Sequence, residues 1–524
     1  MTITAEAATA RSPRWPWHWP MTLVRAGRAA ASGGAASAAT SARAGRLWMA
    51  GALFGSAAFA AGVAAFSDVS LHRSWGLVAA CAYLAAGVAV LSWPSHGRDL
   101  ALLLSVGGAL VTPLLLNTTS GQAQDEVTVV ARSAWLLVHG QSPYPLAGQL
   151  VAAHYPGGYN PYLPAMSAFG VPQALLGPGP LTDPRVWFVL VSVLAFGLAL
   201  RAAGARNVIR WTALVAASPL IAFELCVGGT DVPVVALMCL GLALLRRQPR
   251  PVLAGLVLGV AAAAKATAWP ALAIVVVMMT ARSGWQRAAA MLGAAAGACA
   301  ALAGPVAWHW PAGLVANTVA FPLGLASTKS AAASPLPGHL IASTGPAGRV
   351  IALALLVAAG VTACAWLAAA PPRTVPAATG RLAAVLLALF TLAPQTRFGY
   401  YIYPAVLVAW LGISQVASRA PAGHDEVLVA SEELSLHSEA GGLHERAQDG
   451  SLTSPDTAVL GHGVDRAGRN DQLRWDPHEH LVRGSVLAGD DWHQLEQERY
   501  VVARLVGPLR QCGPPGADVE VGHD

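Results

Sequence analysis

The chain has 524 residues, of which 55% are hydrophobic and only 11% carry a charge. This charged share is about half that of an ordinary soluble domain, and apolar runs long enough to cross about 30 Å of hydrocarbon recur between residues 47 and 411. The composition therefore excludes a soluble globular protein, and the lack of short alternating segments excludes a membrane β-barrel. We expect an all-α, polytopic helical membrane protein.

The net charge of +6 combines two regions of opposite sign. Residues 1–414 contain 24 basic and 8 acidic residues, whereas residues 415–524 contain 9 and 19. The basic excess comes mainly from arginines beside apolar runs, so it does not indicate nucleic-acid binding. Only Lys265 and Lys329 are lysines, a bias typical of a GC-rich bacterial genome. The six cysteines show no paired spacing and predict neither disulfides nor a zinc site.

Three regions follow one another along the chain. Residues 1–46 predict a flexible basic arm, and residues 415–524 predict an acidic, mostly disordered tail, both of them cytoplasmic. Residues 47–414 predict a membrane domain with about ten to thirteen transmembrane helices. The expected spans are 47–66, 75–93, 100–116, 184–202, 211–226, 232–245, 251–264, 268–281, 288–308, 350–370, 382–395 and 401–414.

Arginines between the spans predict the orientation in the membrane. Four arginine-bearing connections fall on the cytoplasmic side if the N-terminus is inside. These connections are 203–210, 246–250, 282–287 and 371–381. A large loop after the third span, 117–183, and a second loop, 309–349, then lie outside. We expect a multi-pass protein of a bacterial plasma membrane with both termini in the cytoplasm.

The first external loop carries an unusual concentration of polar and aromatic residues. It contains two adjacent carboxylates, Asp125 and Glu126, and a later cluster of tyrosines at Tyr144, Tyr155, Tyr159 and Tyr162. A loop this long is either disordered or functional, and its aromatic content argues against disorder. A helix beginning at Asp125 would stabilise the negative charge at its N-terminus. Asp125 is then either an active-site acid or a simple N-cap.

Four further charged residues lie beside apolar sequence, where each charge is costly. Glu224 and Asp231 bracket a Gly-Gly-Thr turn, and either bind a metal or orient an acceptor hydroxyl, or mark two helix ends. Lys265, in AAAAKATAWPAL, and Arg397, in APQTRFGYYIYP, suit a phosphate. The structural alternative for both cations is a side chain that snorkels to the membrane surface.

Several motifs together resemble a known family. Asp125, Gly140, Pro143 and Tyr144, followed by Tyr159-Asn160-Pro161, resemble the membrane-embedded glycosyltransferases of the GT-C superfamily. The match is closest to the polyprenol-phosphate-mannose-dependent mannosyltransferases of glycosyltransferase family 87. The segment that ends at Lys265 resembles a family segment with a lysine after a Gly-rich span. The resemblance covers about residues 50–414, whereas the extra spans before the loop and the long tail depart from the core fold.

The resemblance implies an inverting transfer of a hexose, with mannose expected, from a polyprenyl-phosphate donor to a glycolipid or polysaccharide acceptor. Asp125 would be the general base, with Glu126 beside it leaving the acid ambiguous. Lys265 and Arg397 would hold the donor phosphate, and we expect these cations and Asp125 to share one external cavity. Residues implied to bind substrate are Tyr144, Tyr159, Asp231 and Tyr400. No nucleotide, nucleic acid or assigned metal is implied, and a divalent cation stays open as a cofactor.

Two other classes of protein compete with this interpretation. A transporter or lipid flippase also needs many spans and a few buried charges, but it should show internal repeats or paired broken helices. We find neither in the sequence, and the polar residues gather in long loops on one side. An inactive membrane scaffold would not explain the tyrosine-rich external loop.

Overall fold

The computed structural model describes residues 35–93, 95–145, 158–326 and 330–419. These ranges contain helices and no strand, apart from one isolated bridge between Ala333 and Thr396. The all-α prediction is therefore confirmed. Residues 1–34 of the expected flexible arm, Tyr155, and residues 420–524 of the expected tail lie outside the described residues. The described parts of that arm and tail, 35–46 and 415–419, are helical.

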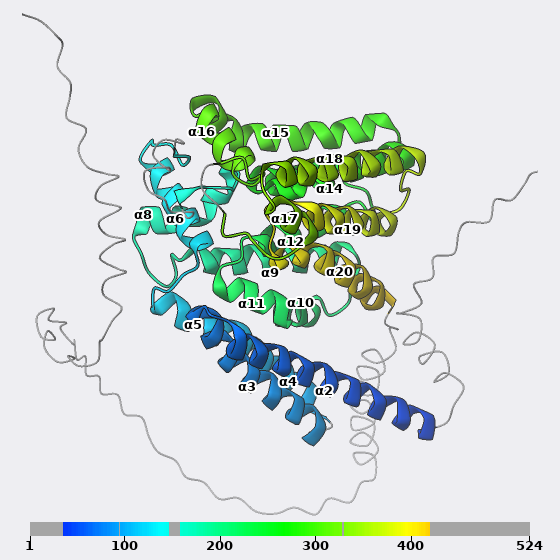
Figure 1. Cartoon of the computed structure of the whole chain (residues 1–524). Coiled ribbons are helices and arrows are strands. Elements are labelled where there is room, and N and C mark those ends of the chain that lie inside the picture. Colours follow the sequence, from blue (N-terminus) through cyan, green and yellow to red (C-terminus); the bar gives the residue numbers. More distant parts are fainter. Residues whose placement is uncertain (1–34, 94, 146–157, 327–329, 420–524) are drawn as a thin grey trace, which may run out of the picture. The chain divides into compact units, whose positions relative to one another are not determined.

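The N-terminal part of the described chain forms a group of packed helices, drawn in blue in Figure 1. It consists of α2 (Ala35–Phe66), α3 (Ser70–Ser92), α4 (Gly97–Ser105), the π-helical turn η2 (Val106–Val111) and α5 (Thr112–Thr119). The last three elements follow one another without a break and together are long and apolar enough to cross a membrane.

The loop region and the first central helices come next. They are α6 (Asp125–Val138), the 3-10 helix η4 (Pro164–Gly170), α8 (Val171–Leu176), α9 (Pro184–Ala202), α10 (Val208–Ala216), α11 (Pro219–Val227), α12 (Asp231–Ala243) and α13 (Pro251–Ala264). The prediction that a helix begins at Asp125 is confirmed.

The remaining helices complete the bundle in Figure 1. They are η5 (Ala266–Ala268), α14 (Trp269–Ser283), α15 (Trp285–His309), α16 (Pro311–Val315), η6 (Ala316–Ala320), α17 (Pro337–Ala342), α18 (Pro346–Ala369), α19 (Val375–Leu392), η7 (Phe398–Tyr401) and α20 (Ile402–Arg419).

Eight helical segments of the described chain are long and apolar enough to span a membrane. A ninth results if α10 and α11, which meet at 67°, count as one broken span. The expected spans 232–245 and 251–264 correspond to α12 and α13, which have only 13 and 14 residues. A helix of 13 residues is about 20 Å long, too short to cross hydrocarbon alone. The polytopic helical membrane fold is thus present, with part of it built from shorter helices.

Helix α12 forms the centre of the bundle, where it packs against α9, α13 and α20. After Asp231 at its first position, its residues are apolar all round, and nearly all of them are buried. An α-helix without a polar face is stable only when protein or lipid surrounds it. Here protein surrounds it, so α12 is a core helix that neighbouring spans shield from the bilayer.

Small residues allow α13 to pack closely against α15. A Cβ atom added at Gly259 would lie 2.8 Å from the Cα atom of Ala295, and one at Gly255 would contact the backbone at Met291. Glycines four residues apart let two membrane helices approach at backbone distance. This contact fixes α13, and with it the chain break that follows at Lys265.

We predict that Gly259→Ala lowers the midpoint of thermal unfolding of the detergent-solubilised protein, because the added methyl group pushes α13 away from α15. Overpacking of this kind costs about 1–3 kcal/mol. The matched control is Gly293→Ala in α15, where nothing lies within 4 Å of the added atom. The control should unfold at or above the wild-type midpoint, since alanine favours helix. Equal midpoints for the two variants would contradict the close contact.

Candidate functional site

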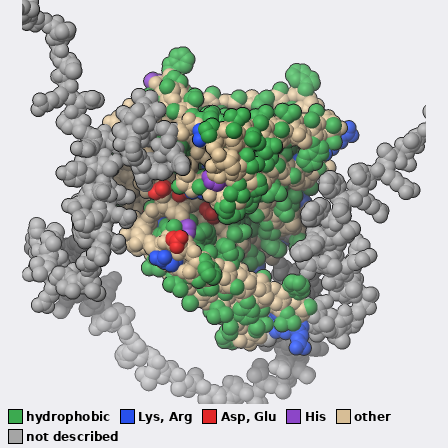
Figure 2. Space-filling view, in the orientation of Figure 1, with side chains coloured by type: hydrophobic (Ala, Val, Ile, Leu, Met, Phe, Trp, Pro, Cys, Tyr) green, Lys and Arg blue, Asp and Glu red, His purple; other side chains and the backbone are tan. Residues whose placement is uncertain are grey.

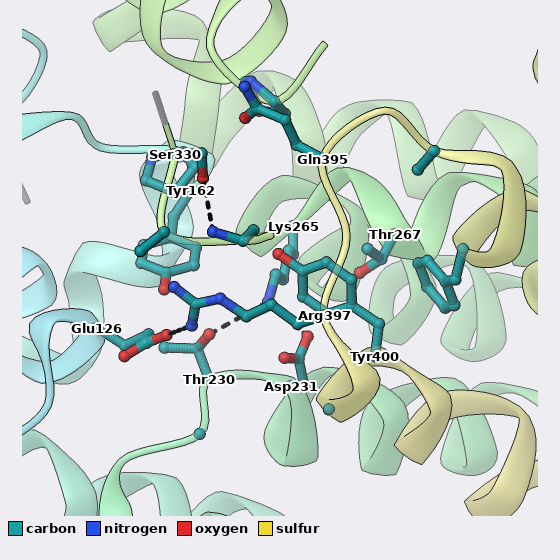
Figure 3. A pocket seen from close by; sticks show the side chains of 18 of the residues that line it. Glu126, Tyr162, Thr230, Asp231, Lys265, Thr267, Ser330, Gln395, Arg397 and Tyr400 are labelled. Carbon is teal, nitrogen blue, oxygen red and sulfur yellow. Dashed lines mark hydrogen bonds and ion pairs between the residues drawn. The ribbon is translucent and has the colours of Figure 1, made fainter. Parts of the chain in front are cut away.

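A cavity of about 620 Å³ lies at the end of the bundle where α6 and α12 begin and where α13 gives way to α14. Figure 2 shows acidic side chains gathered at a hollow in this face of the molecule. The polar side chains shown in Figure 3 come from distant parts of the chain. They are Glu126, Tyr162, Thr230, Asp231, Lys265, Thr267, Ser330, Gln395, Arg397 and Tyr400.

Two acids enter the cavity wall at the first turn of α6. Gln124 is extended, with ψ of 160°, so the helix begins at Asp125 and places both Asp125 and Glu126 at its positive end. Glu126 forms an ion pair with Nη1 of Arg397, whereas Asp125 lines the cavity at a more exposed position. The two neighbouring carboxylates therefore have different surroundings.

The start of α6 is attached to the N-terminal helices by His72 of α3. Nε2 of His72 lies in hydrogen-bond contact with Nε2 of Gln124, and Nδ1 lies 2.9 Å from Oγ of Ser67. The imidazole also packs edge-on against Phe223, with 4.9 Å between ring centroids. His72 lines the cavity, although the sequence analysis did not single it out.

A glycine turn places Thr230 and Asp231 at the start of α12. Gly228 ends α11 with φ of +112°, a conformation that favours glycine, and a side chain there would overlap Val127 of α6. The turn therefore brings α6 and α11 together. It also directs the first residues of α12 toward the cavity, which Thr230 and Asp231 both line.

Lys265 occupies a break between helices. Its φ of −154° and ψ of 134° are extended, so α13 ends at Ala264 and α14 starts only after the turn η5. The carbonyl of Ala264 accepts a hydrogen bond of 3.0 Å from the backbone N–H of Leu163. Nζ of Lys265 pairs with Asp231 and donates to Oγ1 of Thr230 at 3.2 Å.

Two tyrosine rings flank the Lys265 ammonium. Nζ lies 5.3 Å from the ring centroid of Tyr162 and 5.5 Å from that of Tyr400, within the range of cation–π attraction. Burial raises the pKa of both phenols, so each keeps its proton at neutral pH and can donate a hydrogen bond. The ammonium thus has an acidic partner on one side and phenol groups beside it.

Arg397 is held by a segment that pairs with another loop. The backbone N–H of Thr396 donates to Ala332 at 3.0 Å, and Ser334 donates back to the carbonyl of Thr396 at 3.0 Å. The pairing keeps the backbone of Arg397 extended. Its Nη1 binds Glu126, while its buried Nε–H has no hydrogen-bond acceptor in the described part of the chain. The protein therefore satisfies only part of the guanidinium's hydrogen-bonding capacity.

The structure brings together most of the residues that the sequence analysis singled out. Asp125, Lys265 and Arg397 share the cavity, and Glu126, Asp231, Tyr159 and Tyr400 line it as well. Tyr159 stacks on Phe321 at a centroid distance of 4.1 Å.

Tyr144 occupies a different position. It lies outside the cavity lining and is fully buried, and its hydroxyl donates to the carbonyl of Tyr162 at 2.8 Å. Tyr144 therefore stabilises the loop that contains Tyr162 without lining the cavity.

Other lining residues were not among the expected site residues. Thr230 and Thr267 lie beside Asp231 and Lys265 in the sequence, and this proximity is a signal that could have identified them. Gln395 gave the same signal, since it lies two residues before Arg397. Ser330 gave none, because only the folding of its loop brings it to the cavity. Within the described ranges, no group of three or more His, Cys, Asp or Glu side chains is placed to hold a metal ion.

The model of glycosyltransferase family 87 matches residues 160–424. The chain belongs to glycosyltransferase family 87. The matched range contains Asp231, Lys265 and Arg397, whereas the first turn of α6 and His72 precede it. No curated protein and no solved structure matches the chain. As a member of family 87, the protein is a multi-pass membrane glycosyltransferase, which confirms the resemblance found in the sequence.

We predict that Lys265→Met destabilises this family 87 enzyme, because Asp231 would remain buried without a cation. Asp231 and Lys265 are only 8% and 9% exposed, and removing one partner of a buried pair costs about 3–5 kcal/mol. The double variant Lys265→Met/Asp231→Asn should recover part of the loss in a thermal unfolding assay.

The matched control is Arg210→Met, which breaks an exposed pair with Asp99. It should shift the midpoint of unfolding only slightly, because surface ion pairs contribute little. A double variant no more stable than Lys265→Met alone would show that the buried pair is not the cause.

Proposed function

We propose that this glycosyltransferase transfers a hexose from a polyprenyl-phosphate donor to a hydroxyl group of a glycolipid or polysaccharide acceptor. The observation that carries the proposal is that one cavity contains two cations and also an apolar stretch of wall from α14, α18 and α19. A polyprenyl-phosphate sugar combines an anionic phosphate, a polar sugar and a long apolar chain, and the cavity offers a matching surface for each.

Lys265 and Arg397 are suited to the phosphate. Arg397 lines the cavity with a partly exposed side chain, and Lys265 offers a compact charge at a helix break. Charge-assisted hydrogen bonds to phosphate oxygens are about twice as strong as neutral ones. Both cations already have carboxylate partners that hold them in place, so they are pre-organised to stabilise the charge that develops on the leaving phosphate.

The apolar wall is suited to the polyprenyl chain. Pro270 of α14, Leu356 of α18, and Leu386, Leu389 and Phe390 of α19 line the cavity. The segments that contain α14, α18 and α19 are each long and apolar enough to cross a membrane. A chain that follows this wall leads from the charged end of the cavity into the hydrocarbon between these helices.

Asp125 is suited to act as the general base. Glu126 is engaged by Arg397, whereas Asp125 lines the cavity at its more exposed side, where an acceptor hydroxyl can reach it. The carboxylate takes the hydroxyl proton as the acceptor oxygen bonds to the anomeric carbon. The bond from that carbon to the phosphate oxygen breaks on the opposite face, so the phosphate leaves with the electron pair and the configuration inverts.

We place the cavity on the external side of a bacterial plasma membrane. α12 and α14 begin at the cavity, α13 ends there, and their other ends meet the connections 246–250 and 282–287. At that far end Arg282 donates to the carbonyl of Leu245 at 2.9 Å. Arginine-bearing connections favour the cytoplasmic side. A lipid-linked donor suits the external side, where no nucleotide sugar is supplied.

The donor class can be tested with purified protein in lipid vesicles. We predict sugar transfer from polyprenyl-phosphate-mannose to a mannolipid acceptor, and no transfer from GDP-mannose, because the cavity provides an apolar wall but no nucleotide-binding motif. The measurement is the formation of radiolabelled glycolipid. Transfer from GDP-mannose alone would contradict the proposed donor.

The base can be tested by comparing Asp125→Asn with Glu126→Gln. We predict that Asp125→Asn lowers kcat by about 10²–10⁴-fold, the usual contribution of general-base catalysis. Glu126→Gln should mainly change the KM for the donor, because it removes the carboxylate that pairs with Arg397.

Asp68→Asn provides the control, since Asp68 is exposed and lies outside the cavity lining. It should retain wild-type kinetics. Full activity of Asp125→Asn together with inactive Glu126→Gln would assign the base to Glu126 instead.

A further inference from the structure

A fourth carboxylate of the cavity, Glu224, has no role in the function proposed above. It lies on the last turn of α11 and lines the cavity together with Phe223, Gly229 and Tyr400. Within the described residues, no side chain or backbone group donates a hydrogen bond to its carboxylate. An unpartnered carboxylate beside apolar sequence is costly unless a ligand satisfies it.

The donors nearest in the cavity wall are engaged elsewhere. Lys265 binds Asp231 and Thr230, and Nη1 of Arg397 binds Glu126. Both ring nitrogens of His72 are also in contact with other groups, one with Ser67 and one with Gln124. The protein therefore supplies cations to its other two inner carboxylates, and leaves the oxygens of Glu224 available to a ligand.

Two glycines leave the carboxylate uncovered. A side chain at Gly229 would overlap Oε2 of Glu224, and a Cβ atom at Gly399 would lie 3.3 Å from Oε1. Gly399 is two residues after Arg397, and Gly229 is two residues before Asp231. Both segments that carry the phosphate-binding charges thus pass close to Glu224 without covering it. A group bound there lies beside the phosphate and not along the apolar wall.

We propose that Glu224 binds the sugar of the donor, with its two carboxylate oxygens accepting hydrogen bonds from hydroxyl groups of the hexose ring. A carboxyl group can accept hydrogen bonds at both of its oxygens, so it matches a ligand that offers several O–H groups. The phosphate-linked hexose is the part of the donor that lies next to the phosphate. This inference rests on the proposed function and adds a residue that selects the sugar.

Such a carboxylate discriminates between sugars by the hydroxyls that they carry. A donor without the contacted hydroxyl leaves the carboxyl group of Glu224 without a partner, and sites built around a hydroxyl group strongly reject analogues that lack it. Leaving a buried polar group without its hydrogen bond corresponds to about a 5- to 150-fold effect. We therefore expect Glu224 to affect selectivity for the hexose of the donor and not selectivity for its polyprenyl chain.

The test combines a variant of the protein with a change in the substrate. The wild type, Glu224→Gln and Glu224→Asp are each assayed in vesicles with polyprenyl-phosphate-mannose and with its 2-, 3-, 4- and 6-deoxy forms. We expect one deoxy donor to lower kcat/KM of the wild type by about tenfold or more. Glu224→Gln should lose a similar factor with the parent donor, but little more with that same deoxy donor.

Additive losses would overturn the assignment, as would wild-type kinetics of Glu224→Gln with the parent donor. Glu224→Asp keeps the carboxyl group and should show an intermediate loss, which tests the proposal even if the Gln variant folds poorly. Asp99→Asn, at an exposed ion pair outside the cavity lining, should reproduce the wild-type profile. A wild type that transfers no sugar from any of these donors would instead overturn the proposed function, whereas an active wild type with additive losses overturns only the role of Glu224.

Discussion

The need to neutralise charge inside an apolar protein governs the architecture of this glycosyltransferase. Lys265 and Arg397 each bind a carboxylate from a distant segment, Asp231 and Glu126 respectively. The partners in each pair are far apart along the chain. Each pair therefore holds two distant elements next to each other. Together the pairs tie the starts of α6 and α12 to the break after α13 and to the loop before α20. The cavity exists because these four ends are held together.

The helix breaks are as important as the helices. Extended backbone at Lys265 and Arg397, and the left-handed glycine at Gly228, interrupt helices at one end of the bundle. Irregular backbone is tolerated at membrane depth only where protein or a polar cavity satisfies it. Here the loop from Tyr159 to Leu163 and the segment around Ser334 provide those hydrogen bonds. The polar loops therefore position the charges and also satisfy the backbone that carries them.

The sequence predicted the class of fold and much of the candidate site, for a physical reason. Charges are rare in this membrane domain, so Asp125, Lys265, Asp231 and Arg397 stood out, and the structure places all four around one cavity. The sequence did not show that Glu126 pairs with Arg397 across 271 positions, or that His72 reaches Gln124. It also could not show that Tyr144 is buried outside the cavity lining. These features depend on packing between distant elements, which local patterns do not encode.

The buried pair also constrains how the protein is made. Asp231 opens the short central helix α12, and its cation, Lys265, follows 34 residues later, after α13. During synthesis the acid therefore emerges well before the group that neutralises it. Because α12 is also too short to cross the bilayer alone, we expect α12 and α13 to enter the membrane as one hairpin. The order of translation thus leaves Asp231 without its cation until α13 is complete.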